Sequence, residues 1–144
     1  MKAIIQRVNE SSVSVNNQVI GQIKKGYCIL VGFSIDDTEE KIPTIAEKIL
    51  KLRIFDDQEG NMNLDINEVK GSILLISNFT LYADTHKGNR PSFKESLNFN
   101  ESKILYDKLI AYFKEKIDIQ TGEFGADMEV LIKNDGPVTI TIEV

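Results

Sequence analysis

The chain has 144 residues, of which 42% are hydrophobic and 27% charged, and this balance predicts a soluble globular domain with a full hydrophobic core. No apolar run approaches the length of a membrane span, so we expect no membrane partner. The net charge of −5 argues against a broad surface that follows nucleic-acid phosphates; we expect no DNA partner, although a nucleic acid held at one end is compatible with this charge.

The first residues alternate like a strand and do not resemble a signal peptide. The single cysteine, Cys28, cannot form an internal disulfide, and in the apolar run 27–32 it is expected to be inert packing. These two features predict a cytoplasmic protein.

Strands dominate the first part of the sequence, and a helix follows them. The predicted strands are 2–9, 12–15, 19–24 and 27–33, with turns at 16–17 and 25–26. Apolar residues then recur at helical spacing from Ile42 to Leu52. We expect this helix to begin near Asp37 or Thr38, where acidic residues suit the positive end of the helix dipole, with Pro43 bending its start or setting it later.

The second half contains a buried strand and a capped helix. Residues 53–55 predict a short strand before a turn at 56–60, and the apolar run 72–77 predicts a strand buried on both faces. Asn98 and Glu101 have the spacing of a capping box and predict a helix to about residue 116. Its apolar face, assigned to the core, comprises Leu105, Leu109, Tyr112, Phe113 and Ile117. The last predicted strands are 119–124, 128–132 and 138–144.

Together these elements predict an α+β fold. We expect a strand-rich single domain, residues 1–144, in which mixed β-sheets form a barrel-like core with two main helices packed on it. No internal repeat, low-complexity segment or linker divides the chain.

The usual sequence signatures of enzymes are missing. There is no phosphate-binding glycine loop and no Gly-x-Ser-x-Gly elbow, and one cysteine and one histidine give no metal spacing, so we expect no metal and no cofactor. His86 lies in a polar loop. It has two interpretations, a general base or an ordinary exposed histidine. Lys87, Arg90 and Lys94 form a small positive cluster nearby, which suits either a solvated loop or a contact with phosphate.

Two short segments carry more information. The buried strand ends in Ser77, Asn78, Phe79 and Thr80. Ser77, Asn78 and the local amides could donate hydrogen bonds to a developing oxyanion, and Thr80 could be a nucleophile, although no adjacent base is visible. The alternative is a polar strand end with Phe79 turned inward.

The second segment is the pair Gly136-Pro137, directly before the last strand. Gly136 can adopt backbone angles that a β-carbon forbids, and Pro137 fixes φ and removes a donor. The bond between them can be cis at modest cost. Such a corner is either an ordinary turn or a recognition element, and the pair alone favours a turn.

In combination, the segments 77–81 and 134–139 resemble the paired signatures of the D-aminoacyl-tRNA deacylases. The similarity covers essentially the whole chain and is specific through the order and spacing of its segments. The further matching segments are 5–8, 53–55, 60–64, 88–93 and 121–128.

This resemblance implies a homodimer that hydrolyses the ester joining a D-amino acid to the 3′ end of tRNA. It implies that Gly136-Pro137 forms a cis peptide that enters the partner subunit's pocket, where backbone carbonyls leave no room for the side chain of an L-amino acid. Such a pocket should accept many D-residues, and glycyl-tRNA as well. Arg7 and Met128 are expected to support this corner, and Asn134 joins them among the substrate-binding residues.

The resemblance also implies how catalysis works without a conventional catalytic group. An aminoacyl ester is already activated, and the neighbouring 2′-hydroxyl of the terminal adenosine can assist attack, so the enzyme mainly positions the ester and stabilises its oxyanion. We assign the amides around Phe79 and Thr80 to the oxyanion, and Ser77 and Asn78 to the adenosine end. Two alternatives stay open: Thr80 as a covalent nucleophile, and a non-catalytic module that binds the tRNA 3′ end.

One position departs from the family pattern. The first motif usually has glutamine where this chain has Asn78, whose side chain is one methylene shorter. The donor and acceptor set is unchanged, but the reach is smaller. We therefore expect a side-chain contact with substrate at this position to be lost or bridged by water.

Overall fold

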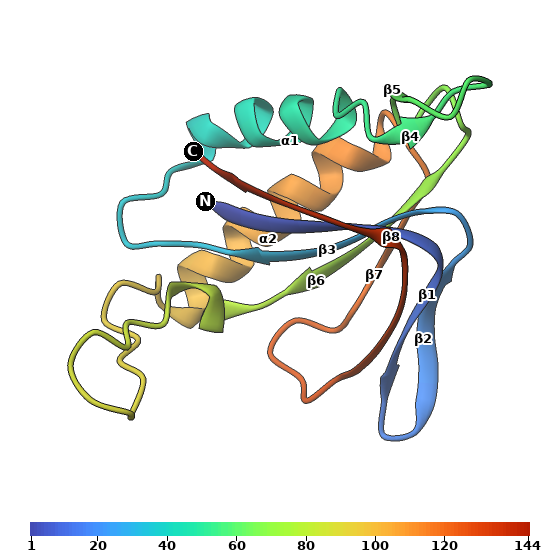
Figure 1. Ribbon diagram of the computed structural model, residues 1–144. Helices are drawn as coiled ribbons and strands as arrows, with labels where there is room; N and C mark the ends of the chain where they lie inside the picture. Colours follow the sequence, from blue (N-terminus) through green and yellow to red (C-terminus); the bar gives the residue numbers. More distant parts are fainter.

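The sheet is built around its first strand, β1. The computed structural model describes residues 1–144 (Figure 1). The strands are β1 (Lys2–Val15), β2 (Gln18–Ile23), β3 (Gly26–Gly32), β4 (Phe55–Asp56), β5 (Met62–Leu64), β6 (Ser72–Ser77), β7 (Ile119–Thr121) and β8 (Glu129–Glu143). The helices are α1 (Ile42–Leu50) and α2 (Phe99–Lys114), with short 3-10 helices at Glu39–Lys41 and Phe79–Tyr82. Neither α1 nor α2 has the length and apolar character needed to cross a bilayer.

The main sheet is mixed and strongly curved. Its order is β2-β1-β3-β6-β7, and β8 also pairs with β1. The first half of β1 pairs with β3 and the second half with β2, while β8 follows β1 along nearly its whole length, all antiparallel. β6 runs parallel to both β3 and β7. The result is a nearly closed, barrel-like sheet, which confirms the predicted α+β class (Figure 1).

Both faces of β3 and β6 are buried, as the apolar run 72–77 predicts. Ile73 and Leu75 face α1 and α2 in the larger core cluster. Leu74 and Ile76 point the other way, into a smaller cluster enclosed by the curve of the sheet, which also holds Cys28. Burial of the Cys28 side chain raises the pKa of its thiol, so this cysteine packs as an inert apolar group.

Two pairs of predicted strands are each one continuous strand. The predicted segments 2–9 and 12–15 are both part of β1. The predicted segments 128–132 and 138–144 are joined in β8, which begins one residue later, at Glu129, and ends one residue earlier, at Glu143. Asn9 has no direct partner in β8, because Val8 lies opposite Asn134 and Glu10 opposite Lys133. This bulge, together with the polar residues around it, interrupts the hydrophobic alternation without ending the ladder.

The remaining differences are at the ends of elements. Thr38 is the N-cap residue of a 3-10 turn, Glu39–Lys41, and α1 begins later than Asp37 or Thr38, at Ile42. Pro43 lies in the first turn of α1, where the missing N–H would have no intrahelical acceptor, so the expectation that this proline sets the start of the helix later is confirmed. The predicted strand 53–55 is displaced, since β4 is Phe55–Asp56, and β5 was not predicted. The predicted strand 119–124 ends at Thr121. α2 ends at Lys114, two residues before the predicted end near residue 116.

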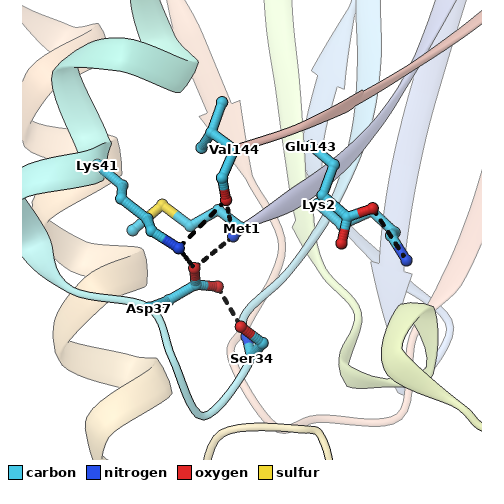
Figure 2. A network of polar contacts seen from close by, with 7 residues as sticks. All are labelled: Met1, Lys2, Ser34, Asp37, Lys41, Glu143 and Val144. Carbon is cyan, nitrogen blue, oxygen red and sulfur yellow. Dashed lines mark hydrogen bonds and ion pairs between the residues drawn. The ribbon is translucent and has the colours of Figure 1, made fainter.

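Asp37 binds the amino terminus of the chain and does not cap a helix (Figure 2). Its buried carboxylate accepts hydrogen bonds from the Met1 ammonium at 2.5 Å and from Lys41 Nζ at 2.7 Å, and the Met1 ammonium also donates to the Val144 carbonyl at 3.0 Å. Burial lowers the pKa of the ammonium. Burial opposes ionisation of Asp37, but the hydrogen bonds from Lys41 and the ammonium outweigh it and lower its pKa. This cluster joins the ends of β1 and β8 to the loop before α1.

Candidate active site

A pocket of about 450 Å³ opens at the carboxyl end of β6. Its polar groups come from Ser77 and Asn78, and the remaining surface is largely apolar. β6 and β3 are parallel, so both deliver their carboxyl ends to this edge of the sheet, where binding groups commonly lie. The apolar walls comprise Leu30, Ile76, Phe79, Phe99, Phe124, Met128, Val130 and Ile132, with Gly125 and Ala126.

Ser77 and Asn78 are held at this edge by β3. Ser77 is the last residue of β6 and lies opposite Val31 in the parallel register. The Asn78 N–H donates to the Val31 carbonyl at 2.7 Å, which extends the parallel ladder to the last residue before the 3-10 helix. A β-carbon at Gly32 would lie 2.8 Å from the Asn78 carbonyl oxygen, so this close approach needs a glycine.

The Asn78 side chain caps the 3-10 helix that follows. Its Oδ1 accepts hydrogen bonds from the Thr80 N–H at 3.2 Å and from the Thr80 hydroxyl. The Thr80 N–H, expected to bind the oxyanion, and the Thr80 hydroxyl, considered as a nucleophile, therefore both donate to Asn78. Thr80 also does not line the pocket. The Phe79 N–H is at the first position of the helix and has no intrahelical acceptor. Among the amides of this turn, Phe79 offers the free donor.

Phe79 is turned outward, contrary to the alternative of an inward aromatic. Its side chain is 59% exposed and forms part of the pocket wall. The Phe93 ring meets it edge to face with centroids 5.0 Å apart, and the Ser96 hydroxyl donates to its carbonyl at 3.1 Å. The loop that follows β6 is thus attached directly to the mouth of the pocket.

Gly136 and Pro137 lie within β8, in an insertion, and do not begin a new strand. Gln6 pairs with Thr139 and Val8 with Asn134, so residues 135–138 lie opposite Arg7 alone. The Gly136–Pro137 peptide bond is cis, and Gly136 has φ +124°. A β-carbon on Gly136 would lie 2.7 Å from Val138 Cγ2 and 2.9 Å from Val138 N. The insertion therefore requires glycine at this position.

Side chains on both sides hold the insertion in shape. Asn134 Oδ1 accepts from the Val138 N–H at 3.0 Å, closing the loop. The buried Arg7 guanidinium forms an ion pair with Asp135 at 3.1 Å, and its Nη1 donates to the Ile54 carbonyl at 2.6 Å. These contacts fasten a solvent-exposed corner to the body of the protein.

The two sequence motifs do not meet within one chain. Arg7, Asn134, Gly136 and Pro137 are all absent from the pocket wall that Ser77, Asn78 and Phe79 share. Met128 lies in the pocket wall and packs close to Gly122, in the part of the chain that joins β7 to β8. Of the nine residues that the sequence singles out, the structure brings four together at the pocket, Ser77, Asn78, Phe79 and Met128.

The polar loop after the pocket holds the other candidate groups. His86 is 93% exposed, lies outside the pocket, and contacts Asp84 through Nδ1 at 2.5 Å. The backbone and ring hydrogen bonds from His86 lower the pKa of the Asp84 carboxyl. No group of three or more His, Cys, Asp and Glu side chains gathers into a metal site.

Sequence reasoning missed the aromatic wall of the pocket. Phe99 is 62% exposed in the first turn of α2 and stacks edge to face on Phe124, with centroids 5.1 Å apart. Gly125, with φ +78°, lets the Phe99 ring approach, because a β-carbon there would lie 2.5 Å from the ring. An exposed phenylalanine directly after the Asn98 cap was the signal that could have revealed this wall.

Comparisons with known proteins show the family of the chain. The family model described as D-Tyr-tRNA(Tyr) deacylase matches residues 4–143. The chain is 54% identical to the D-aminoacyl-tRNA deacylase of Clostridium novyi (strain NT) and 49% identical to that of Clostridium botulinum (strain 657 / Type Ba4), in both cases over 99% of this chain and 97% of the relative.

Two solved structures share the fold. One is the c-Myc DNA Unwinding Element Binding Protein, which superposes with a TM-score of 0.95 at 36% identity. The match covers 100% of this chain and 99% of that protein's chain. The other, a probable eukaryotic D-amino acid tRNA deacylase, has a TM-score of 0.83 at 17% identity, covering 99% and 98%, and shows the fold alone. With the family model matching nearly the whole length, the chain belongs to the D-Tyr-tRNA(Tyr) deacylase family.

Proposed function

We propose that this protein hydrolyses the ester bond of D-aminoacyl-tRNA, releasing free tRNA and the D-amino acid. The observation that carries this proposal is the pocket at the end of β6, where Ser77, Asn78 and Phe79 meet a largely apolar wall in a chain of this family. An apolar pocket with few convergent polar groups suits an aminoacyl side chain joined to an adenosine. Because charged tRNA is the substrate, we also propose a cytoplasmic location.

Catalysis in this proposal depends on position and on hydrogen bonding. Water attacks the ester carbonyl, the bond to the 3′ oxygen breaks, and the 2′-hydroxyl of the terminal adenosine assists the proton transfer to the leaving 3′ oxygen. The Phe79 N–H, free at the start of its helix, donates to the developing oxyanion. Ser77 and Asn78 border the adenosine end of the pocket.

We propose that selectivity comes from a second copy of the chain. In a homodimer, the exposed Gly136-Pro137 corner of one subunit enters the pocket of the other, and the carbonyls of Gly136 and Pro137 face the α-carbon of the substrate. An L-side chain would collide with this backbone, whereas a D-side chain or the hydrogen of glycyl-tRNA would not. The support is that Gly136 and Pro137 are exposed, that Arg7 forms an ion pair with Asp135 beside them, and that neither residue lines the pocket of its own chain.

The covalent alternative has less support. The Thr80 hydroxyl donates to the amide oxygen of Asn78, which is no base, and Thr80 lies outside the pocket wall. A non-catalytic module for the tRNA end is the other alternative. One structural neighbour is named for binding a DNA element, but the net charge of −5 gives this chain no broad basic surface for a duplex.

Release of tyrosine from D-tyrosyl-tRNA and L-tyrosyl-tRNA tests the proposal. We expect rapid release of the D-enantiomer and little of the L-enantiomer. Equal hydrolysis of both would refute the chirality filter. Tight binding of charged tRNA with no release over hours would show a binding module instead.

Mixed dimers test the exchange of loops. Gly136→Ala disturbs the loop, and Ala126→Phe fills the pocket, so each variant alone should be nearly inactive. After subunit exchange, hybrid dimers hold one intact loop facing one intact pocket, and the mixture should recover about a quarter of wild-type activity. A mixture that stays inactive, although both variants form dimers that exchange subunits, would show that the loop does not act on the partner.

A further inference from the structure

Three cations gather on one loop of an acidic protein. Lys87, Arg90 and Lys94 are all exposed and none forms an ion pair or side-chain hydrogen bond, while the whole chain has a net charge of −5. The segment 85–94 contains no acidic residue. Nearby Asp84 directs its carboxylate to His86 and not to any of the three cations. Glu95 follows Lys94 directly, but it forms no ion pair with any of the three cations. The segment therefore presents three cations that no carboxylate of the protein pairs with.

The base of this loop is fixed beside the pocket. Asp84 and Ser92 exchange two backbone hydrogen bonds, of 2.8 and 2.9 Å, which close residues 85–91, with Lys87 and Arg90, into a projecting loop (Figure 1). Lys94 lies two residues beyond this closure, at the base of the loop. The adjacent Phe93 ring packs against Phe79 of the pocket wall at 5.0 Å, and the Ser96 hydroxyl donates to the Phe79 carbonyl. The cations thus extend from the rim of the pocket into solvent.

We propose that this cationic loop, comprising Lys87, Arg90 and Lys94, binds backbone phosphates of the single-stranded acceptor end of the tRNA whose terminal ester occupies the pocket. The inference rests on the proposed function, because it takes the tRNA as the molecule in the pocket. A nucleic acid held by its last nucleotide must leave the pocket past the rim, and the next phosphates then lie near the loop. Unpaired, exposed Lys and Arg suit such contacts, which position a nucleic acid without reading its sequence.

The cations should act on affinity and leave chemistry unchanged. None of the three cations lines the pocket. Neutralising phosphates of a single strand releases counterions, with a slope of about 0.7 in log affinity against log salt for each contact. Three contacts therefore contribute a slope of about 2, or about a fifteenfold change in affinity between 50 and 200 mM salt.

The test compares two substrates with one variant. The variant Lys87→Gln/Arg90→Gln/Lys94→Gln removes the cations from exposed positions. Its matched control, Lys24→Gln/Lys48→Gln/Lys114→Gln, removes the same charge from exposed residues that form no ion pair. Lys24 is near the opposite end of β6 from Ser77, Lys48 is on α1, and Lys114 ends α2. The substrates are D-tyrosyl-tRNA and the D-tyrosyl ester of adenosine, which has no phosphate.

We expect the loop variant to raise KM for D-tyrosyl-tRNA about tenfold or more at 50 mM salt, with kcat and hydrolysis of the adenosine ester unchanged. For binding of uncharged tRNA, the slope of log affinity against log salt concentration should be smaller by about 2 in the loop variant than in the wild-type protein. The control variant should keep the wild-type slope. The charge-preserving variant Lys87→Arg/Arg90→Lys/Lys94→Arg should restore binding.

Each other outcome is decisive. Equal KM values for the loop variant and the control would overturn the inference. Loss of activity on both substrates would also overturn it, because the loop would then be acting on the pocket through Phe93 and Phe79. If the wild-type protein hydrolyses neither substrate, the proposed function fails, and uncharged tRNA binding still decides whether the loop contacts phosphate.

Discussion

The side-chain oxygen of Asn78 accepts hydrogen bonds from both the backbone N–H and the hydroxyl of Thr80. A polar residue at the end of a buried strand thus organises the next turn of the chain and occupies both donors of its neighbour. The shorter side chain of asparagine suits this local contact two residues along the chain. Phe79, between them, lines the pocket, and its backbone N–H has no acceptor within the helix.

Thr80→Ala should leave turnover of D-tyrosyl-tRNA within about threefold of wild type, because the hydroxyl makes one local hydrogen bond worth about 1 kcal/mol. Single-turnover hydrolysis measures this, with circular dichroism as the check on folding. Thr80→Ser, which keeps the hydroxyl, is the matched variant. Complete loss in Thr80→Ala with an intact fold would restore the covalent mechanism.

Asn78→Asp should separate stability from activity. Aspartate is as good a helix cap as asparagine, so the free energy of unfolding in urea should change by less than about 1 kcal/mol. A carboxylate beside the Phe79 N–H would repel the developing oxyanion, and we expect kcat to fall at least about tenfold. Unchanged kcat in Asn78→Asp would show that the oxyanion forms elsewhere.

Gly136→Ala should reduce D-ester turnover at least about tenfold, since the new β-carbon would collide with the backbone and side chain of Val138 and displace the loop. Gly60→Ala is the matched control. Gly60 also has positive φ, +81°, but a β-carbon added there would meet nothing within 4 Å, and the residue is absent from the pocket wall. The control should lose about 1 kcal/mol of stability and keep its activity. Equal activity of the two variants would argue against a role for the 135–138 loop.

Asp37→Asn should lower the free energy of unfolding at pH 7 by about 3 kcal/mol or more, because it leaves the buried Met1 ammonium without its carboxylate. Since folding lowers the pKa of Asp37, its contribution is present above the unfolded value, about 3.9, and is lost as pH falls through the lower folded pKa. Urea titrations at several pH values should show the two proteins converging below about pH 4. Asp36→Asn, at an exposed neighbour without an ion pair, should match wild type throughout.

Features with a local cause could be predicted from the sequence. β6 has the predicted bounds, the Asn16-Asn17 turn has the positive φ values that a tight hairpin needs, and Asn98 caps α2 by accepting from the Glu101 N–H at 3.1 Å. Each depends on a few adjacent residues, whose patterns of hydrophobicity and hydrogen bonding are written in the sequence itself. The family could be recognised in the same way, from two short segments at a fixed spacing.

Only the tertiary structure decided where those segments lie. β8 continues across Gly136 and Pro137 because β1, more than a hundred residues away in sequence, pairs with it on both sides of the insertion, and no local pattern contains that partner. The same long-range pairing places Arg7 against Asp135 and separates the insertion from the pocket of its own chain. The sequence determined which residues form the two motifs; the register of distant strands decided that one chain cannot join them.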